Sequence, residues 1–280
     1  MIDSQMVSTP GATLHVRVIG SGPSVLLLHG FPDSSRGFRE LCESLAQRGF
    51  RAIAPDLRGY GLSDKPEGIE QYRSSALLED ISALVRWTGE ERVAVVGHDW
   101  GGTLAYLLAT VHPEQVSHLV VLNAAHPESY ARALTRSLQL LRSWYVLFFQ
   151  LRGIAEWLVT RRWIFQWLLR KLVARKDSLS EADIEAGRRE LLRPGTVRAA
   201  LSYYRAAFRY PIKCPGTIAA PTLVLWGARD PALDPSLLQD LPGRVPHLTV
   251  HQVEGAGHFV HWDDPERVVS ELVRFLGSPT

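Results

Sequence analysis

Short apolar runs alternate with amphipathic helical patterns over the first 125 or so residues. The helical period runs through Leu41 and Leu45, from Ser75 to Trp87, and again from Gly101. Consecutive apolar positions between helices are typical of parallel strands that are covered on both faces. The pattern therefore predicts an α/β fold. The predicted strands are ATLHVRVIG (12–20), SVLLLHG (24–30), RAIAPD (51–56), VAVVG (93–97) and HLVVLNA (118–124).

The strand pattern stops after residue 127. From Glu128 to Tyr210 the periodicity is helical and rich in leucine, arginine and aromatic residues, with serine and glutamate at capping spacing in SLSEADIEAGRREL. Strand-like runs return in TLVLWG (222–227) and HLTVHQVEG (247–255), and a proline-led amphipathic helix ends the chain. We therefore expect a core formed by 1–127 and 214–280, with an all-helical cap at 128–213 over the ligand-binding edge of the sheet.

Composition and charge narrow the function classes. A chain of 280 residues, 46% of them hydrophobic, can bury one large core. The net charge of +2 comes from well-mixed acidic and basic residues, so no nucleic-acid partner is expected. A basic run lies among tryptophan and leucine residues and has two interpretations, a solvated helix face or a membrane-surface helix. This run contains Arg161, Arg162, Arg170, Lys171, Arg175 and Lys176.

The sequence also predicts a location. No apolar run reaches the roughly 18 residues of a membrane span, and the N-terminus lacks the pattern of a secretory leader, so no stable membrane insertion is expected. Cys42 and Cys214 have neither disulfide-framework nor metal-ligand spacing and are predicted to be buried thiols. We expect a cytoplasmic monomer or homodimer. No metal cluster, dinucleotide fingerprint or P-loop is found, so no cofactor is implied.

Three candidate chemical groups follow predicted strands. Asp99 follows VAVVGH, Asp230 follows TLVLWGAR, and His258 follows HLTVHQVEGAG. Each residue, taken singly, also has an ordinary structural interpretation. Asp99 could be a helix N-cap, Asp230 a turn residue before proline, and His258 a loop histidine. The glycines Gly97, Gly101 and Gly102 instead favour a tight strand-to-helix turn at Asp99. In chain order the three residues match the nucleophile, acid and histidine of a hydrolase triad.

Eight motifs carry a wider resemblance. In their order and spacing, the sequence resembles the α/β-hydrolase family over nearly its full length, and specifically its epoxide hydrolase branch. The resemblance implies a mostly parallel sheet with helices on both faces and an all-helical cap inserted after the sixth strand. The motifs are HGFPDSS, DLRGYGLSDKP, GHDWGG, LNAAHP, WYVLFFQ, SYYR, WGARDPAL and GAGHFVHWDDPE.

An aspartate in place of the usual serine indicates the reaction type. Attack at a saturated carbon requires a nucleophile that is already anionic, and a carboxylate with a pKa of about 4 meets that need at neutral pH. His258 is then free to take a proton from the water that hydrolyses the resulting ester, while Asp230 orients its ring. The oxyanion formed on Asp99 would accept the N–H groups of Trp100 and, by resemblance, Phe31.

The leaving group is predicted from further residues. An epoxide oxygen needs a proton donor, and the resemblance places Tyr145 and Tyr204 on the cap as donors; both could instead be ordinary packing residues. Tyr203 is the rival of Tyr204, since adjacent helical positions point about 100° apart. His29, Pro32 and Phe259 are expected to contact substrate, with His29 and Pro32 also shaping the turn around a candidate cis bond.

Two alternatives stay open. A haloalkane or haloacid dehalogenase would use the same aspartate, although Phe31 and Trp100 replace the asparagine and arginine usual at these positions in haloalkane and fluoroacetate dehalogenases. A catalytically silent binding protein is the more remote alternative, because no triad residue is lost. Ser35 and Phe38 replace tryptophans of the usual epoxide hydrolase pattern, so the sequence does not determine the shape of the pocket. The expected substrates are a small apolar epoxide and water.

Overall fold

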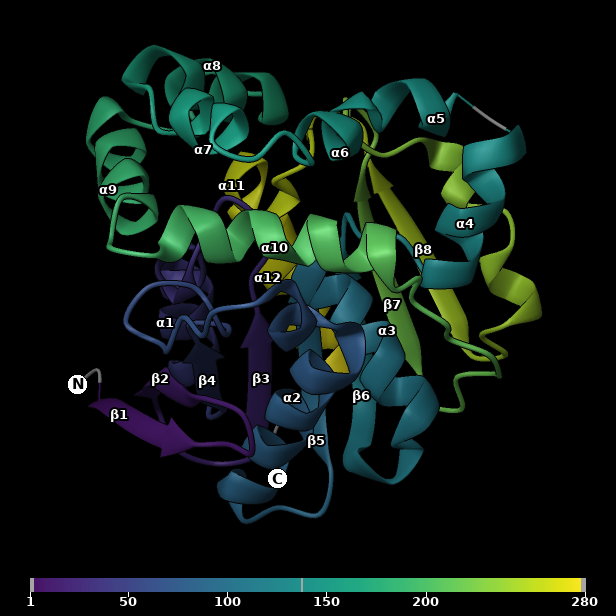
Figure 1. Cartoon of the computed structure of the whole chain (residues 1–280). Helices are drawn as coiled ribbons and strands as arrows, with labels where there is room; N and C mark the ends of the chain where they lie inside the picture. Colours follow the sequence, from purple (N-terminus) through teal and green to yellow (C-terminus); the bar gives the residue numbers. More distant parts are fainter. Residues whose placement is uncertain (1–2, 137, 278–280) are drawn as a thin grey trace.

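A central sheet of eight strands carries a layer of helices on each face (Figure 1). The computed structural model describes residues 3–136 and 138–277. The strand order is β1-β2-β4-β3-β5-β6-β7-β8, and all neighbours from β4 to β8 are parallel, whereas β1 pairs with β2 and β2 with β4 in antiparallel fashion. The strands are β1 (Asp3–Ser8), β2 (Thr13–Ile19), β3 (Ser24–Leu28), β4 (Arg51–Pro55), β5 (Val93–His98), β6 (Val116–Leu122), β7 (Thr222–Gly227) and β8 (Leu248–Val253).

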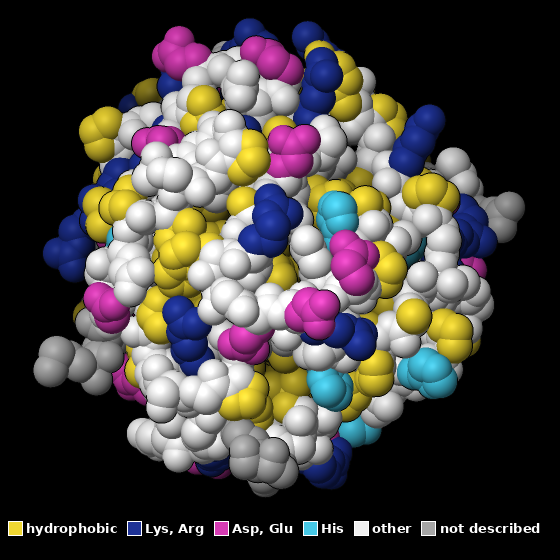
Figure 2. All heavy atoms as spheres, turned by 90° about the horizontal axis from the view of Figure 1, so that it is seen from below, with side chains coloured by type: hydrophobic (Ala, Val, Ile, Leu, Met, Phe, Trp, Pro, Cys, Tyr) yellow, Lys and Arg dark blue, Asp and Glu magenta, His cyan; other side chains and the backbone are white. Residues whose placement is uncertain are grey.

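An all-helical cap follows the sixth strand. It lies beyond the carboxyl ends of the parallel strands, and the long helix α10 runs along its boundary with the core (Figure 1). The cap helices are α4 (Pro127–Arg136), α5 (Gln139–Arg142), α6 (Trp144–Phe148), α7 (Ile154–Val159), α8 (Arg162–Leu172), α9 (Glu181–Leu191) and α10 (Thr196–Arg209). On the side of the molecule opposite the cap, acidic, basic and histidine side chains are interspersed (Figure 2).

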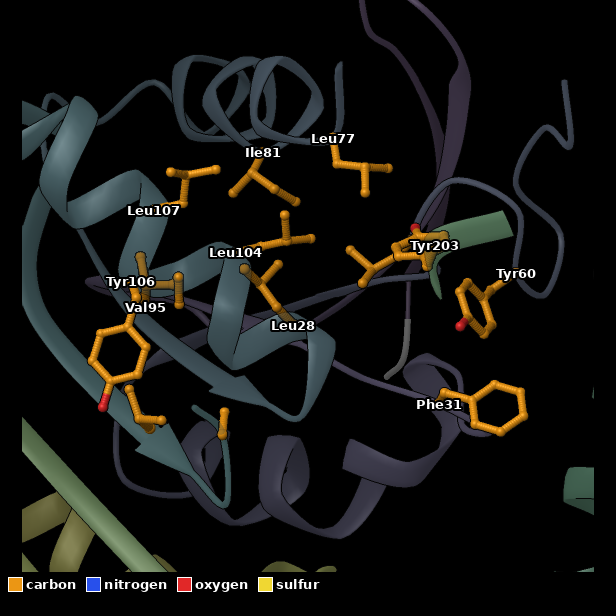
Figure 3. Packing of buried hydrophobic residues seen from close by; sticks show 14 of the residues in the cluster. Leu28, Phe31, Tyr60, Leu77, Ile81, Val95, Leu104, Tyr106, Leu107 and Tyr203 are labelled. Atoms are coloured by element: carbon orange, nitrogen blue, oxygen red, sulfur yellow. The ribbon is translucent and has the colours of Figure 1, made fainter. Parts of the chain in front are cut away.

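The sheet is apolar on both faces because successive side chains of a strand point to opposite sides. In β3, Leu26 and Leu28 join one buried cluster, while Val25 and Leu27 join the other. The first cluster is closed by α2 and α3, whose leucines and Ile81 meet the strand side chains (Figure 3). The second is closed by α1 and α12. The core helices are α1 (Arg39–Ala46), α2 (Ser74–Thr88), α3 (Trp100–Val111), α11 (Val260–Asp263) and α12 (Pro265–Leu276).

The predicted strands agree closely with these bounds, with one omission among them. The edge strand β1 was not predicted, because DSQMVS is mostly polar and four of its six residues are exposed. An antiparallel edge strand needs little apolar surface of its own, since its backbone pairs with β2 along its whole length. Cys42 and Cys214 are free and buried, as expected. Within residues 3–136 and 138–277, every helix is too short or too polar to cross a bilayer.

Candidate active site

The turn between β5 and α3 holds Asp99 in a conformation that side chains rarely adopt. Its φ is 49° and its ψ is −119°. Small neighbours make the turn possible: a Cβ atom on Gly101 would lie 1.9 Å from the carbonyl oxygen of Leu28, and one on Gly97 would lie 2.5 Å from that of Gly101. The three motif glycines therefore allow the close backbone packing that presents the Asp99 carboxylate at the end of the strand.

Each oxygen of the Asp99 carboxylate has a separate partner. The N–H of Phe31 donates to Oδ1 at 2.8 Å, and Nε2 of His258 lies 3.5 Å from Oδ2. Trp100 is the first residue of α3, so its N–H has no acceptor within that helix. The loop after β3, with a cis Phe31–Pro32 bond, and the start of α3 thus flank the same carboxylate.

Behind Asp99, a charged pair fixes the imidazole ring. Nδ1 of His258 lies 2.8 Å from Oδ2 of Asp230, and both side chains are buried. The other oxygen of Asp230 accepts the N–H groups of Ala232 at 2.7 Å and Leu233 at 3.0 Å. Because Oδ2 also accepts the amide of Asn123 at 2.8 Å, the carboxylate is fully held in its anionic form.

The electrostatics of the site favour a cationic ring between two carboxylates. Burial lowers the pKa of His258, but the charge and hydrogen bond of Asp230 and the neighbouring Asp99 outweigh it and raise the pKa to about 10. Burial would raise the pKa of Asp99, but the hydrogen bond and charge of His258 outweigh that effect and lower it. The pKa of Asp230 is likewise lowered, because the charge of His258 and its hydrogen bonds outweigh burial. Asp99 is therefore anionic at neutral pH.

A cavity of about 420 Å³ opens from Asp99 toward the cap. Tyr145 from α6 and Tyr204 from α10 line it together with Asp99 and Trp100. Tyr203 does not line it, because its hydroxyl points to the core and donates to the backbone oxygen of Arg58 at 2.7 Å. The remaining lining is mostly apolar and comprises Thr103, Ala124, Ala125, Pro127, Tyr130, Ala131, Leu134, Leu140, Ser143, Val146, Leu147, Ala207, Phe208, Pro211, Ile212 and Leu233.

Tyr145 and Tyr204 share one environment. Their ring centroids are 5.9 Å apart, with Phe149 packed edge-on against both rings. Burial raises the pKa of Tyr204 well above its ordinary value, and the charge of Asp99 raises it further. Burial has the same effect on the pKa of Tyr145, with contributions from Tyr130 and Asp99. Both hydroxyls are therefore protonated donors while Asp99 is charged.

The three residues that the sequence predicted to contact substrate lie outside the lining of this cavity. His29 has both ring nitrogens near backbone groups, Nε2 accepting the N–H of Leu57 at 3.0 Å and Nδ1 lying 3.0 Å from the oxygen of Gly30. Pro32 borders a separate groove between α1, α12 and the cap. Phe259 is fully buried and stacks on Trp262, with ring centroids 4.0 Å apart. His29, Pro32 and Phe259 are therefore not among the residues that line the cavity beside Asp99.

Several site residues were missed in the sequence. Asn123 follows β6 with a φ of 37° and donates to Asp230, and Arg142 donates to the backbone oxygen of Asp230 at 2.7 Å. Tyr130 lines the cavity and shares a 2.7 Å hydrogen bond with Ser143. The signal for Asn123 was its place directly after a strand, next to the carboxyl ends that carry the other site residues. Among the described residues, His, Cys, Asp and Glu form no group of three suited to a metal ion.

Comparison with known proteins places the chain in a family. The model of the α/β hydrolase fold family matches residues 23–265. The chain belongs to the α/β-hydrolase family. Within it, the chain falls in the epoxide hydrolase branch: Epoxide hydrolase 3 of Xenopus tropicalis is 34% identical over 91% of this chain and 71% of that protein. The AB hydrolase superfamily protein YfhM of Bacillus subtilis is 34% identical over 98% of both chains.

Solved structures agree with this placement. A crystal structure of a mutant epoxide hydrolase from Bacillus megaterium superposes with a TM-score of 0.88 at 31% identity, covering 97% of this chain and 99% of that one. Epoxide hydrolase I of potato superposes with a TM-score of 0.86 at 25% identity and covers 99% of both chains. The similarity therefore includes the cap as well as the sheet.

Proposed function

We propose that this protein hydrolyses a small apolar epoxide to a vicinal diol through an ester on Asp99. The observation that carries the proposal is the cavity that an anionic carboxylate lines together with two protonated tyrosines, Tyr145 and Tyr204. A carboxylate can attack a saturated carbon, and a phenol can protonate the strongly basic oxygen that leaves it. The mostly apolar lining supports an apolar substrate.

In the first step, Oδ2 of Asp99 attacks a ring carbon of the epoxide and the bond from that carbon to the epoxide oxygen breaks. We assign Oδ2 because Oδ1 already accepts the N–H of Phe31, the position expected for the ester carbonyl oxygen. Tyr145 and Tyr204 hold the epoxide oxygen, and one of them gives it a proton. Negative charge leaves Asp99 as the ester forms, so the charge that raised the pKa of both tyrosines disappears.

Loss of the Asp99 charge also prepares His258 for the second step. The raised pKa of His258 depends partly on Asp99, so alkylation lowers it and the ring can give up its proton toward the tyrosinate. Neutral His258 then takes a proton from water as the water oxygen attacks the ester carbonyl carbon. Asp230 stabilises the imidazolium that results.

The tetrahedral intermediate carries a negative oxygen at the position of Oδ1. The N–H of Phe31 is already in place there, and the N–H of Trp100 is the second donor in this proposal. As the intermediate collapses and the ester bond breaks, the imidazolium of His258 gives its proton to the departing oxygen, which leaves as the diol. The carboxyl group left on Asp99 then returns a proton to His258, which restores the starting carboxylate and imidazolium. The chain would act as a core (1–127 and 214–280) that holds the triad and a cap (128–213) that supplies the tyrosines.

The proposal is tested by offering the purified protein three substrate types: styrene oxide, an epoxy fatty acid and a short haloalkane. We expect diol from at least one epoxide, and halide release no faster than in buffer. Halide leaving groups need N–H donors and no acid, so the two tyrosines would be superfluous in a dehalogenase. Steady halide release without diol from any epoxide would contradict the proposal.

A further inference from the structure

The outer side of the cap exposes an unusual number of large apolar side chains. Soluble proteins scatter such residues singly, so many of them on successive helices of one region indicate a contact surface. Outside the cap, the exposed large hydrophobic residues are isolated ones such as Met6, Leu62, Val111 and Val250. We call the group the cap patch, and each member exposes more than half of its surface: Leu140, Leu141, Trp144, Leu147, Leu151, Ile154, Trp157, Trp163 and Trp167.

The helices of the cap patch are apolar on both sides. The helices α6 and α7 pack against α10, and α8 packs against α7 and α9, so their inner sides are already used. In α8, Phe165 and Leu169 are buried, while Trp163 and Trp167 are one turn apart and exposed. A helix whose only partner is the protein core needs a polar outer face. The apolar outer face therefore remains available for a second partner.

The segment that carries the cap patch is rich in positive charge. Between residues 138 and 176 there are eight arginines and lysines but one acidic residue, Glu156, which pairs inward with Arg205 at 2.6 Å. The side chain of Arg161 lies 4.1 Å from the ring of Trp157. Arg170 and Arg175 pair with Glu181 and Asp177. Five cations form no salt bridge with a described residue: Arg152, Arg161, Arg162, Lys171 and Lys176.

The cap patch continues into the mouth of the cavity. Leu140 and Leu147 belong to the patch and also line the cavity, and the exposed Phe208 of α10 lines it from the other side. A molecule dissolved in an apolar phase that covers the patch would meet the cavity without crossing water. This continuity connects the outer surface of the cap to Asp99.

We propose that the cap patch docks this protein on the surface of a lipid bilayer that contains anionic phospholipids. Tryptophan and leucine beside arginine and lysine are the side chains that enter the interfacial region of such membranes. A second copy of the chain is a poorer partner, because an isologous contact would bring two cationic patches together. Docking itself does not depend on the proposed function, whereas delivery of an apolar epoxide from the bilayer rests on it.

The test is sedimentation of the protein with vesicles of phosphatidylcholine alone or with phosphatidylglycerol as about one third of the lipid. We expect binding to the anionic vesicles, a blue shift of tryptophan emission, and loss of binding at high salt. Trp163→Glu combined with Trp167→Glu should weaken binding on the order of 10-fold or more. Val111→Glu is the matched control, because Val111 is also exposed but lies at the end of α3. Circular dichroism checks that each variant is folded.

Three results would overturn the proposal. One is the absence of binding to anionic vesicles by the folded wild-type protein. Another is equal binding to neutral and anionic vesicles, which would remove the role of the cations. The third is a stable dimer that the Trp163 and Trp167 changes dissociate, which would make the patch a contact between two copies. None of these readouts involves turnover, so failure of the proposed epoxide chemistry would leave the docking result intact.

Discussion

The backbone of Asp99 stores strain at the reacting group. A side chain at φ 49° and ψ −119° costs about 1–3 kcal/mol, which the packing of the glycine-lined turn sustains. Glycine would relieve this strain, whereas alanine would keep it. We expect both Asp99→Gly and Asp99→Ala to abolish turnover, with the glycine variant more stable by on the order of 1 kcal/mol after its larger unfolded-state entropy is counted. Urea unfolding measures the difference, and an equally or more stable alanine variant would refute the strain argument.

Two tyrosines of the cavity and one neighbour outside it allow a matched comparison. Tyr145→Phe and Tyr204→Phe remove cavity hydroxyls and should each slow epoxide opening on the order of 10-fold to 1000-fold. Tyr203→Phe removes a hydrogen bond to the backbone of Arg58 and should cost about 1 kcal/mol of stability with little effect on turnover. Single-turnover kinetics and unfolding separate the two outcomes. A large kinetic loss in Tyr203→Phe alone would reverse the assignment.

Protonation of His258 predicts a pH dependence of stability. Its folded-state pKa of about 10 lies above the unfolded value of about 6.5, so its contribution is complete below pH 6.5 and is lost as pH rises toward 10. Wild-type unfolding free energy should therefore fall over this window more steeply than that of His258→Gln. Subtracting the curve of the variant from that of the wild type removes the contribution of the other groups that titrate in this range. Parallel curves would show that the ring is not a buried cation.

For single residues, the sequence predicted which ones belong to the site but not which way each side chain points. The spacing of the motifs predicted Asp99, Asp230 and His258, because each follows a strand and carboxyl ends of parallel strands meet at one edge. It did not decide between Tyr203 and Tyr204, because both are buried and the choice depends on how α10 rotates against the core. Asn123 was missed because its role needs contact with a residue 107 positions away.

Among the elements, α10 is joined by a hydrogen bond to a core loop that a buried ion pair holds in place. Arg58, in the loop after β4, binds Asp80 of α2 through two hydrogen bonds of 2.7 Å, and its backbone oxygen accepts the hydroxyl of Tyr203 on α10. Asp80→Ala would leave the Arg58 guanidinium buried without its carboxylate. We expect a loss of about 3–5 kcal/mol in unfolding free energy, measured by urea denaturation, with the exposed Glu79→Ala as the neighbouring control. A loss similar to that of the control would contradict this role.

The burial of the strands explains why the sequence did not predict β1 and did predict the others. The strands β3 to β7 are apolar on both faces because each face packs against its own helices. β1 lies at the edge of the sheet, and five of its six residues are at least partly exposed, so its sequence carries no run of apolar positions. Its formation depends on backbone pairing with β2, which a local pattern does not reveal.

For the whole molecule, the order of strands brings the distant site residues together. Asp99 follows β5 and Asn123 follows β6, the next strand in the sheet, while Asp230 and His258 follow β7 and β8. The insertion after β6 covers this edge and adds Tyr145 and Tyr204. The topology followed from the motif resemblance, but the shape of the cavity and the exposed cap patch depend on packing between cap helices. These features required the three-dimensional structure.

In the proposed mechanism, Asp99 forms a covalent ester that His258 helps to hydrolyse. The most direct measurement is the intact and peptide mass of His258→Gln after mixing with styrene oxide. Alkylation needs the carboxylate and the tyrosines, so we predict a mass gain of one substrate molecule on a peptide that contains Asp99, with little diol released. An Asp99→Ala, His258→Gln double variant should gain nothing. If the single variant forms no adduct with an epoxide that the wild-type protein converts to diol, water attacks the epoxide directly and the covalent mechanism is wrong.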